Sequence, residues 1–325
     1  MLYLTGDQVL ASLSCEAAMD AVAEAMRRQE TGEYHMPERT AIEGAAQDSC
    51  LLLMPCRTER SLTTKLVSVF PSNAALGLPL IDGVVSLFDA TTGQLQALLD
   101  GKALTARRTG AVSGLAIRHL ADPSARTLGL VGTGAQAAEQ LRHAAVARPL
   151  ERVHLYSRSQ DECAAFAARF ADELPSIEFQ VMDSTAALLD ASEIVLTATT
   201  ARSPVMPDDS GRYRGKLCIA IGSFEADVRE YPDAVFTDLD GVWVDTLHAC
   251  EESGELGLPL ASGCVGREQI ETLGARMQRG EAAQPIGDRT RFFKSVGMGL
   301  FDLCTAEAAV AAAREAGLGV PLGEA

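Results

Sequence analysis

Apolar residues recur with two different spacings in the first 120 residues, and each spacing predicts one kind of element. Residues 8–31 place them on one face, so this stretch predicts a single amphipathic helix. Short, apolar, β-rich runs then predict four strands, at 51–54, 64–70, 83–88 and 94–99. A turn joins the last two as a hairpin, and a helix follows over 105–120. We therefore expect an antiparallel sheet domain at the start of the chain.

From residue 127 onward, apolar strands alternate with amphipathic helices. The predicted strands are 127–131, 153–156, 178–182, 193–200, 216–222 and 234–238. The predicted helices between them are 135–146, 160–170 and 184–191. This alternation predicts the α/β class, with a doubly wound parallel sheet. An alanine-rich helix over 306–316 is expected to pack back on the first domain, giving one domain of 1–122 with 298–325 and another of 123–297.

A glycine-rich turn follows the strand at 127–131 and opens the next helix. In a dinucleotide site, Gly132 would make the tight turn, Gly134 would let the backbone approach a pyrophosphate, and Ala137 would allow close helix–strand packing. The helix N-terminus would face the phosphates. The same letters also fit a small-residue turn between a core strand and a core helix, but the βαβ context favours the dinucleotide interpretation. The expected cofactor contacts in this turn are Gly132, Thr133, Gly134, Ala135 and Gln136.

The end of the strand at 153–156 indicates which nicotinamide cofactor to expect. NAD-binding sites place an Asp or Glu there to hold the ribose 2′-hydroxyl. Here the strand continues into Ser157, Arg158 and Ser159, which can pair with or donate to a 2′-phosphate. We predict NADP(H), with NAD(H) as the alternative if Arg158 is only a solvated cation. Further expected cofactor contacts are Thr109, Thr197, Ala198, Thr199, Lys294, Ser295 and Gly297, the last three in a turn predicted at 292–297.

Composition narrows the function classes. Lys+Arg 28 against Asp+Glu 44 gives a net charge of −16, which argues against nucleic-acid binding. The sequence has no long apolar run and no apparent signal peptide, so we expect a cytoplasmic protein with no membrane segment. The 8 Cys are scattered without a Cys-x-x-Cys pair or a nearby His, which predicts reduced thiols and no metal site.

Several segments together resemble the ornithine cyclodeaminase/μ-crystallin family over nearly the whole length. They are Met36–Thr40, Thr64–Asn73, Gly77–Pro79, Leu99–Gly101, Leu104–Thr109, the glycine turn, Thr197–Thr200 and Lys294–Gly297. The resemblance implies a homodimer whose first domain binds substrate and dimerises and whose second is a Rossmann domain.

It also implies that Arg39, Lys65 and Arg108 hold a substrate carboxylate. The positions of these cations in the sequence also favour a carboxylate site, although each cation alone also fits a solvated surface position. Lys65 lies in an apolar strand, where an unpaired ammonium is unfavourable. Arg108 falls in the first turn of the predicted helix, where the dipole disfavours a cation, so a compensating anion is expected.

The residue at position 224 distinguishes the cyclodeaminases of this family from its ketimine reductases. The resemblance implies that ornithine cyclodeaminases carry a reacting Asp where this chain has Phe224, with Asp227 three residues later. Phe224 can transfer no proton, so the resemblance is to the ketimine reductase branch, and we expect Phe224 near the substrate. One hypothesis gives Asp227 a direct role in catalysis. In the other, Asp227 and Glu230 orient the loop or pair with neighbouring arginines.

The hypothesis is hydride transfer from NADPH to the C=N carbon of a cyclic ketimine carboxylate, giving L-proline or L-pipecolate. Lys65, Arg108 and Asp227 are the candidate catalytic residues. The proton would come from solvent or from Lys65. Ornithine cyclodeaminase, an alanine dehydrogenase-like amino-acid oxidoreductase and a non-enzymatic NADP-binding protein are the alternatives.

Overall fold

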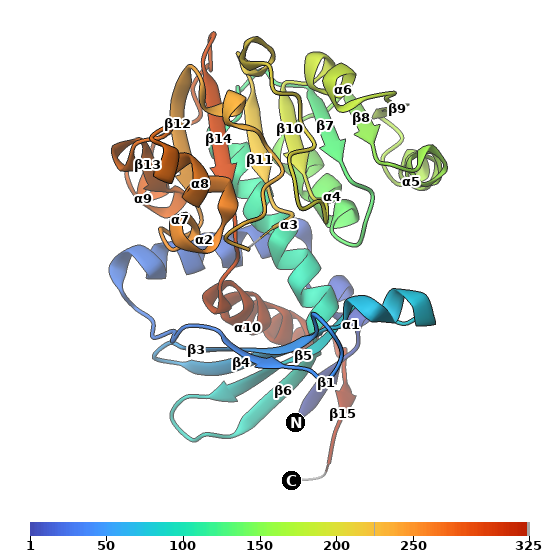
Figure 1. Cartoon of the computed structure of the whole chain (residues 1–325). Coiled ribbons are helices and arrows are strands. Elements are labelled where there is room, and N and C mark those ends of the chain that lie inside the picture. The colour runs from blue at the N-terminus through green and yellow to red at the C-terminus, as the bar shows by residue number, and fades with distance from the viewer. Residues whose placement is uncertain (224, 324–325) are drawn as a thin grey trace. The chain divides into compact units, whose positions relative to one another are not determined.

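The computed structural model describes residues 1–223 and 225–323, and its chain forms two compact units (Figure 1). The first unit contains Met1–Ala111 and Met298–Ala325, and the second contains Val112–Gly297. Among the described residues, no helix is both long and apolar enough to span a membrane.

The first unit is built on a seven-stranded sheet in the order β15-β1-β6-β5-β4-β3-β2. Its strands are β1 (Leu2–Leu4), β2 (Thr40–Glu43), β3 (Cys50–Arg57), β4 (Ser61–Val69), β5 (Ile81–Asp89), β6 (Leu95–Asp100) and β15 (Val320–Pro321). Neighbouring strands are antiparallel except β1 and β6. The four predicted strands and their antiparallel pairing are confirmed. The short strands β1, β2 and β15 carry too few apolar positions to be seen in the sequence.

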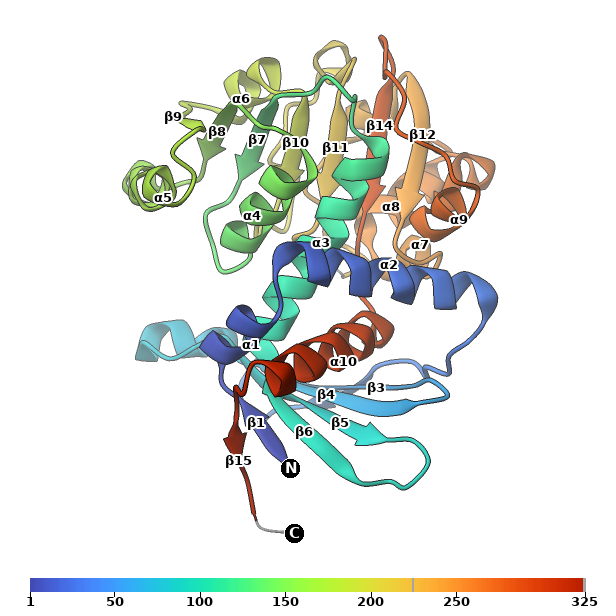
Figure 2. The ribbon, with the colours of Figure 1, turned by 180° about the vertical axis from the view of Figure 1, so that it is seen from behind.

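The first unit also contains helical segments. They are α1 (Gly6–Ser12), α2 (Cys15–Thr31), the 3₁₀ turn η1 (Pro71–Leu76), the start of α3 (Gly101–Leu120) and α10 (Gly299–Glu315). Helix α10 packs on β3, β4 and β5, and α2 packs on α10 (Figure 2). The single helix predicted over 8–31 is wrong: Leu13 is extended, and the Ser14 side chain caps a new helix by accepting from the Ala17 N–H.

The second unit contains an eight-stranded sheet in the order β13-β12-β14-β11-β10-β7-β8-β9, with every neighbouring pair parallel. Its strands are β7 (Thr127–Val131), β8 (Arg152–Tyr156), β9 (Glu178–Val181), β10 (Ile194–Thr197), β11 (Leu217–Ala220), β12 (Leu239–Val244), β13 (Ile270–Thr272) and β14 (Thr290–Lys294). From β7 the chain winds outward through β8 and β9, then returns to begin again at β10. The doubly wound parallel sheet is therefore confirmed, and β7 and β10 flank its topological switch point.

Helices lie on both faces of this sheet. They are α4 (Ala137–Ala147), α5 (Gln160–Glu173), α6 (Thr185–Ala191), α7 (Ala249–Glu252), α8 (Gly254–Ser262) and α9 (Leu273–Gln278), with 3₁₀ turns η2 (Ser210–Tyr213), η3 (Asp233–Phe236) and η4 (Arg267–Gln269). Helices α7 and α8 lie in front of the sheet in Figure 1, and α3 and α4 in front of it in Figure 2. The strand predicted at 234–238 is wrong, because this short apolar run forms η3 and inserts Val235 and Phe236 into the core.

Candidate active site

Lys65 lies on the inward face of β4. Burial alternates along this strand, with Ser61, Thr63, Lys65 and Val67 buried. This period of two directs the ammonium toward α10, which covers the sheet. There the Lys65 Nζ lies 2.8 Å from Oδ2 of Asp302, a side chain with 0% exposure.

Arg108 on α3 reaches the same carboxylate. Its Nε donates to Asp302 Oδ1 at 3.1 Å, and both side chains are buried. The prediction that Arg108 lies in the first turn of its helix is wrong. Helix α3 begins at Gly101, where the Asp100 carboxylate accepts from the Ala103 N–H, so Arg108 belongs to the second turn. The anion expected beside it is Asp302, which the sequence reasoning missed.

The pKa of Lys65 records its surroundings. That pKa is lowered from 10.5 to about 8: burial is the largest cause, the charges of Arg108 and Arg39 act in the same direction, and Asp302 opposes them. Arg39 is half-buried in the segment before β2 and is close enough to act on the Lys65 charge. The first unit thus brings Lys65 and Arg108 together on one carboxylate, with Arg39 near enough for its charge to act on Lys65. The excess positive charge suits a small carboxylate ligand.

In the second unit, the glycine turn has the backbone that a dinucleotide requires. Gly132 has φ +98°, and a Cβ there would lie 2.8 Å from the Ala198 carbonyl oxygen. At Gly134 a Cβ would meet nothing within 4 Å, so this backbone faces open space that a ligand could enter. Thr133, Ala135 and Gln136 complete the turn before α4 begins at Ala137. These residues fit a nicotinamide dinucleotide with its pyrophosphate at the helix N-terminus.

Glu230 holds the strand ends beside this turn. Its side chain has 0% exposure and accepts three hydrogen bonds: from Thr197 Oγ1 at 2.8 Å, from the Thr199 N–H at 2.8 Å and from the Gly222 N–H at 2.8 Å. Thr197 ends β10, and Ala198 and Thr199 follow it at the switch point. Glu230 therefore fixes the loops after β10 and β11 where a cofactor would lie.

After β8, Arg158 is exposed, and no acidic partner is found for it among the described residues. Ser157 and Ser159 already have local partners. Ser157 Oγ donates to the Ser159 carbonyl at 3.1 Å, and Ser159 Oγ accepts from Glu162 N–H at 3.2 Å as the cap of α5. The segment thus presents one unpaired guanidinium on a rigid turn.

The segment 292–297 differs from the predicted turn. Residues 292–294 belong to β14, because Phe292 and Phe293 are core residues, and the turn begins only at Ser295. Lys294 is fully buried and its Nζ donates to the Ser223 carbonyl. Burial lowers the pKa of Lys294, while the charges of Glu255, Glu230 and Asp245 raise it.

Asp245 orders the turn that follows. This buried carboxylate at the end of β12 accepts from Ser295 Oγ at 2.6 Å, from the Val296 N–H at 3.0 Å and from the Gly297 N–H at 2.7 Å. Sequence reasoning missed both Asp245 and Glu255. Their signal is an acidic residue inside an otherwise apolar, buried segment.

Two other predicted site residues, Asp227 and Thr109, are not part of these clusters. Asp227 is 78% exposed, and its carboxylate lies 3.4 Å from Arg202 Nη2. Thr109 is buried on α3 in the first unit. Phe224 lies outside the described residues.

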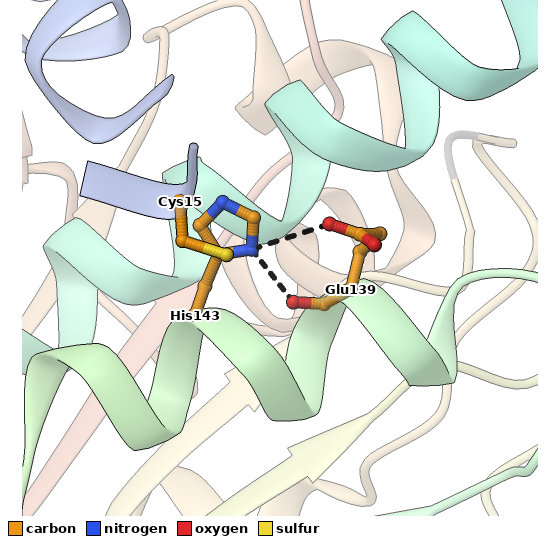
Figure 3. A group of neighbouring side chains, drawn as sticks. All are labelled: Cys15, Glu139 and His143. Atoms are coloured by element: carbon orange, nitrogen blue, oxygen red, sulfur yellow. Dashed lines mark hydrogen bonds and ion pairs between the residues drawn. The ribbon is translucent and has the colours of Figure 1, made fainter. Parts of the chain in front are cut away.

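Two further sets of buried or half-buried polar groups have partners within their own unit. Figure 3 shows Glu139 and His143 one turn apart on α4, where His143 Nδ1 is 2.7 Å from the Glu139 carbonyl oxygen and 3.8 Å from its Oε2. Cys15, labelled in the same figure, belongs to the first unit, in which its Sγ accepts from Arg107 Nη1 at 2.9 Å. We assign these groups a structural role.

The fold and the glycine turn define a dinucleotide-binding protein of the Rossmann class. A model of the ornithine cyclodeaminase/mu-crystallin family matches residues 2–316, and the chain belongs to this family.

Relatives with curated functions cover most of the chain. A Δ1-pyrroline-2-carboxylate reductase of Bacillus cereus (strain ZK / E33L) is 33% identical over 287 residues, 87% of each chain. A Δ1-pyrroline-2-carboxylate/Δ1-piperideine-2-carboxylate reductase of Azospirillum brasilense is 33% identical over 309 residues, 94% of this chain and 95% of its own. The Thermococcus litoralis Δ1-pyrroline-2-carboxylate reductase, solved with NADH and L-proline, matches with a TM-score of 0.91 and 29% identity, covering 99% of this chain and 100% of its own.

Proposed function

We propose that the protein reduces a cyclic ketimine carboxylate, Δ1-pyrroline-2-carboxylate or Δ1-piperideine-2-carboxylate, to L-proline or L-pipecolate with NADPH. It is an NAD(P)-dependent oxidoreductase that acts on a C=N bond. The observation that carries the proposal is the pairing of Lys65 and Arg108 on one buried carboxylate with the charge of Arg39 nearby, an excess of positive charge that favours a small anionic substrate. The reductases of this family named above support the choice of substrate.

The residues of the first unit position the substrate. Arg108 and Arg39 grip its carboxylate, and guanidinium groups can do so through two parallel hydrogen bonds. The C=N carbon receives the hydride that a bound nicotinamide supplies, and the nitrogen takes one proton. Lys65, with a pKa of about 8, is matched to donate that proton near neutral pH, and solvent is the competing source.

The direct test measures two reactions of the purified protein. Oxidation of NADPH is followed with each cyclic imine in turn and with pyruvate plus ammonia. Release of ammonia is followed with L-ornithine and NAD. We expect oxidation with the cyclic imines and formation of the L-amino acid. Ammonia released from ornithine would support a cyclodeaminase, and consumption of pyruvate plus ammonia an alanine dehydrogenase-like enzyme. Binding of NADPH without turnover on any substrate would support a non-enzymatic binding protein.

The preference for NADPH is expected to depend on Arg158. In Arg158→Ala the KM for NADPH should rise about 10- to 100-fold, because a charge-assisted contact to the 2′-phosphate is lost. The KM for NADH should change little, since NADH lacks that phosphate. Steady-state kinetics with both cofactors measure this, and Arg152→Ala, an exposed cation on β8, is the control. Equal losses with both cofactors would contradict the assignment.

The reduction is expected to slow at alkaline pH. Lys65 is protonated below its pKa of about 8, so kcat/KM should fall about tenfold per pH unit above that value as its charge is lost. Lys65→Arg keeps a positive charge and should shift the decline upward by more than one pH unit. The kcat of the Lys65→Arg variant also distinguishes Lys65 from solvent as the proton source, because a guanidinium does not give up its proton near neutral pH. An unchanged decline in this variant would show that another group titrates.

A homodimer is also proposed. Its support is a set of exposed apolar side chains in the first unit: Ile42, Leu51, Leu76, Leu78, Leu80 and Ile81. Surfaces of this kind favour association of chains. A cytoplasmic location stays a prediction.

A further inference from the structure

Asp302 is the one carboxylate, in the part of the chain that the structure describes, within ion-pair distance of Lys65 or Arg108. Its two oxygens are divided between them: Oδ2 lies 2.8 Å from Lys65 Nζ, and Oδ1 accepts from Arg108 Nε at 3.1 Å. The three side chains come from three separate elements, α10, β4 and α3. A shared acid is therefore the direct link between the two cations.

Because Lys65 and Arg108 are buried, both need the shared Asp302 carboxylate as a partner. Both cations are less than a tenth exposed, and a buried charge without a partner is strongly destabilising. We propose that Asp302 is a positioning residue: its carboxylate fixes Lys65 and Arg108 as one rigid pair and supplies the negative charge that lets both stay ionised while they receive the substrate's carboxylate. Asp302 does this without touching the reacting atoms.

The division of oxygens leaves donors for a ligand. Asp302 uses only the Nε of Arg108, so the two terminal Nη groups remain as the planar fork that suits a carboxylate. The charge of Arg39 also acts on Lys65, so the positive charges here outnumber the one internal acid. The excess charge that remains favours a carboxylate-bearing substrate.

Several elements around Lys65 contribute a charged or titratable group. Asp302 approaches from α10, Arg108 from α3 and Arg39 from the segment before β2. On β3, burial and the charge of Asp302 raise the pKa of the Cys56 thiol to about 12, so this thiol stays neutral. Asp302 is thus the one anion that favours protonated Lys65, and its removal should lower the pKa of Lys65 below 8.

The first test needs no substrate, so its outcome is separate from that of the proposed function. In Asp302→Asn the urea midpoint should fall below wild type at pH 6, and the deficit should shrink to about half at pH 9. The sign follows because the variant's Lys65 can lose its proton as pH rises, which relieves the unpaired charge. Glu307→Gln, an acid-to-amide change on the same helix, should show no pH-dependent deficit. A deficit equal at both pH values would reduce Asp302 to a packing role and overturn the proposal.

The second test rests on the proposed function. In Asp302→Asn the alkaline decline of kcat/KM for the cyclic imine should move down by more than one pH unit, with KM rising more than tenfold. Asp302→Glu should recover part of the loss. An unchanged decline would overturn the proposal, whereas absence of turnover in wild type would instead refute the proposed function.

A variant that does not fold is also informative. Adding Lys65→Met to Asp302→Asn removes one of the two unpaired cations, so the double variant should recover soluble, folded protein. A double variant no more stable than Asp302→Asn would contradict the proposed coupling.

Discussion

Replacing Arg108 with alanine is expected to lower kcat/KM for the cyclic imine about 100- to 1,000-fold, because truncating one partner of a buried, hydrogen-bonded charge pair typically removes 2–5 kcal/mol of binding energy. The change takes away the guanidinium fork and leaves Oδ1 of Asp302 without its donor. Most of the loss should appear in KM, since the group holds the substrate in the ground state as well as in the transition state. Steady-state kinetics with saturating NADPH measure it.

Two comparisons make this result specific. Arg60→Ala removes an exposed cation of the same unit and should keep activity within about twofold of wild type. NADPH affinity of Arg108→Ala, measured by fluorescence titration, should also be unchanged, because the glycine turn belongs to the other unit. Wild-type turnover in Arg108→Ala would remove this residue from the substrate site.

Local pattern was sufficient for much of the fold. The apolar runs at β3 to β6 and the alternation from β7 to β11 were predicted because each element carries its own periodic signal. Element boundaries failed where a single side chain decides them, as at Ser14, whose hydroxyl starts α2 inside a continuous helical pattern. The strand prediction at η3 failed for a related reason, since a run of three apolar residues does not distinguish a strand from a buried turn.

Only part of the candidate site could be predicted from the sequence. Lys65 stood out because a charge in an apolar strand needs compensation, and Asp302 supplies that anion. For Arg108 the premise failed, since this residue lies in the second turn of α3 and not in the first, although the same anion pairs with it. The identity of this anion could not be derived, because Asp302 lies 194 residues from Arg108 and meets it only when α10 packs on β4. Lys294 shows the opposite error, since its place in a predicted turn concealed that β14 carries its ammonium into the core.

Lys294→Met is expected to lower the melting temperature of the protein by about 10 °C, through a loss of about 3–5 kcal/mol of unfolding free energy. Its ammonium is the cation whose charge acts on Glu230, Asp245 and Glu255 together. Without it, three buried carboxylates keep only hydrogen bonds from backbone and hydroxyl groups. Differential scanning calorimetry at pH 8, above the pKa of about 7 of Glu255, measures the change.

A second substitution should reverse part of this loss. Burial raises the pKa of Glu255 from 4.5 to about 7, so this carboxyl can be neutralised near neutral pH. Adding Glu255→Gln to Lys294→Met removes one uncompensated charge and should recover several degrees. The Glu230 and Tyr231 N–H groups donate to separate carboxylate oxygens at 2.9 Å, so the single amide oxygen of the glutamine keeps one of these two hydrogen bonds. If the two losses simply add, Lys294 and Glu255 are not coupled, and the ammonium instead serves the Ser223 carbonyl alone.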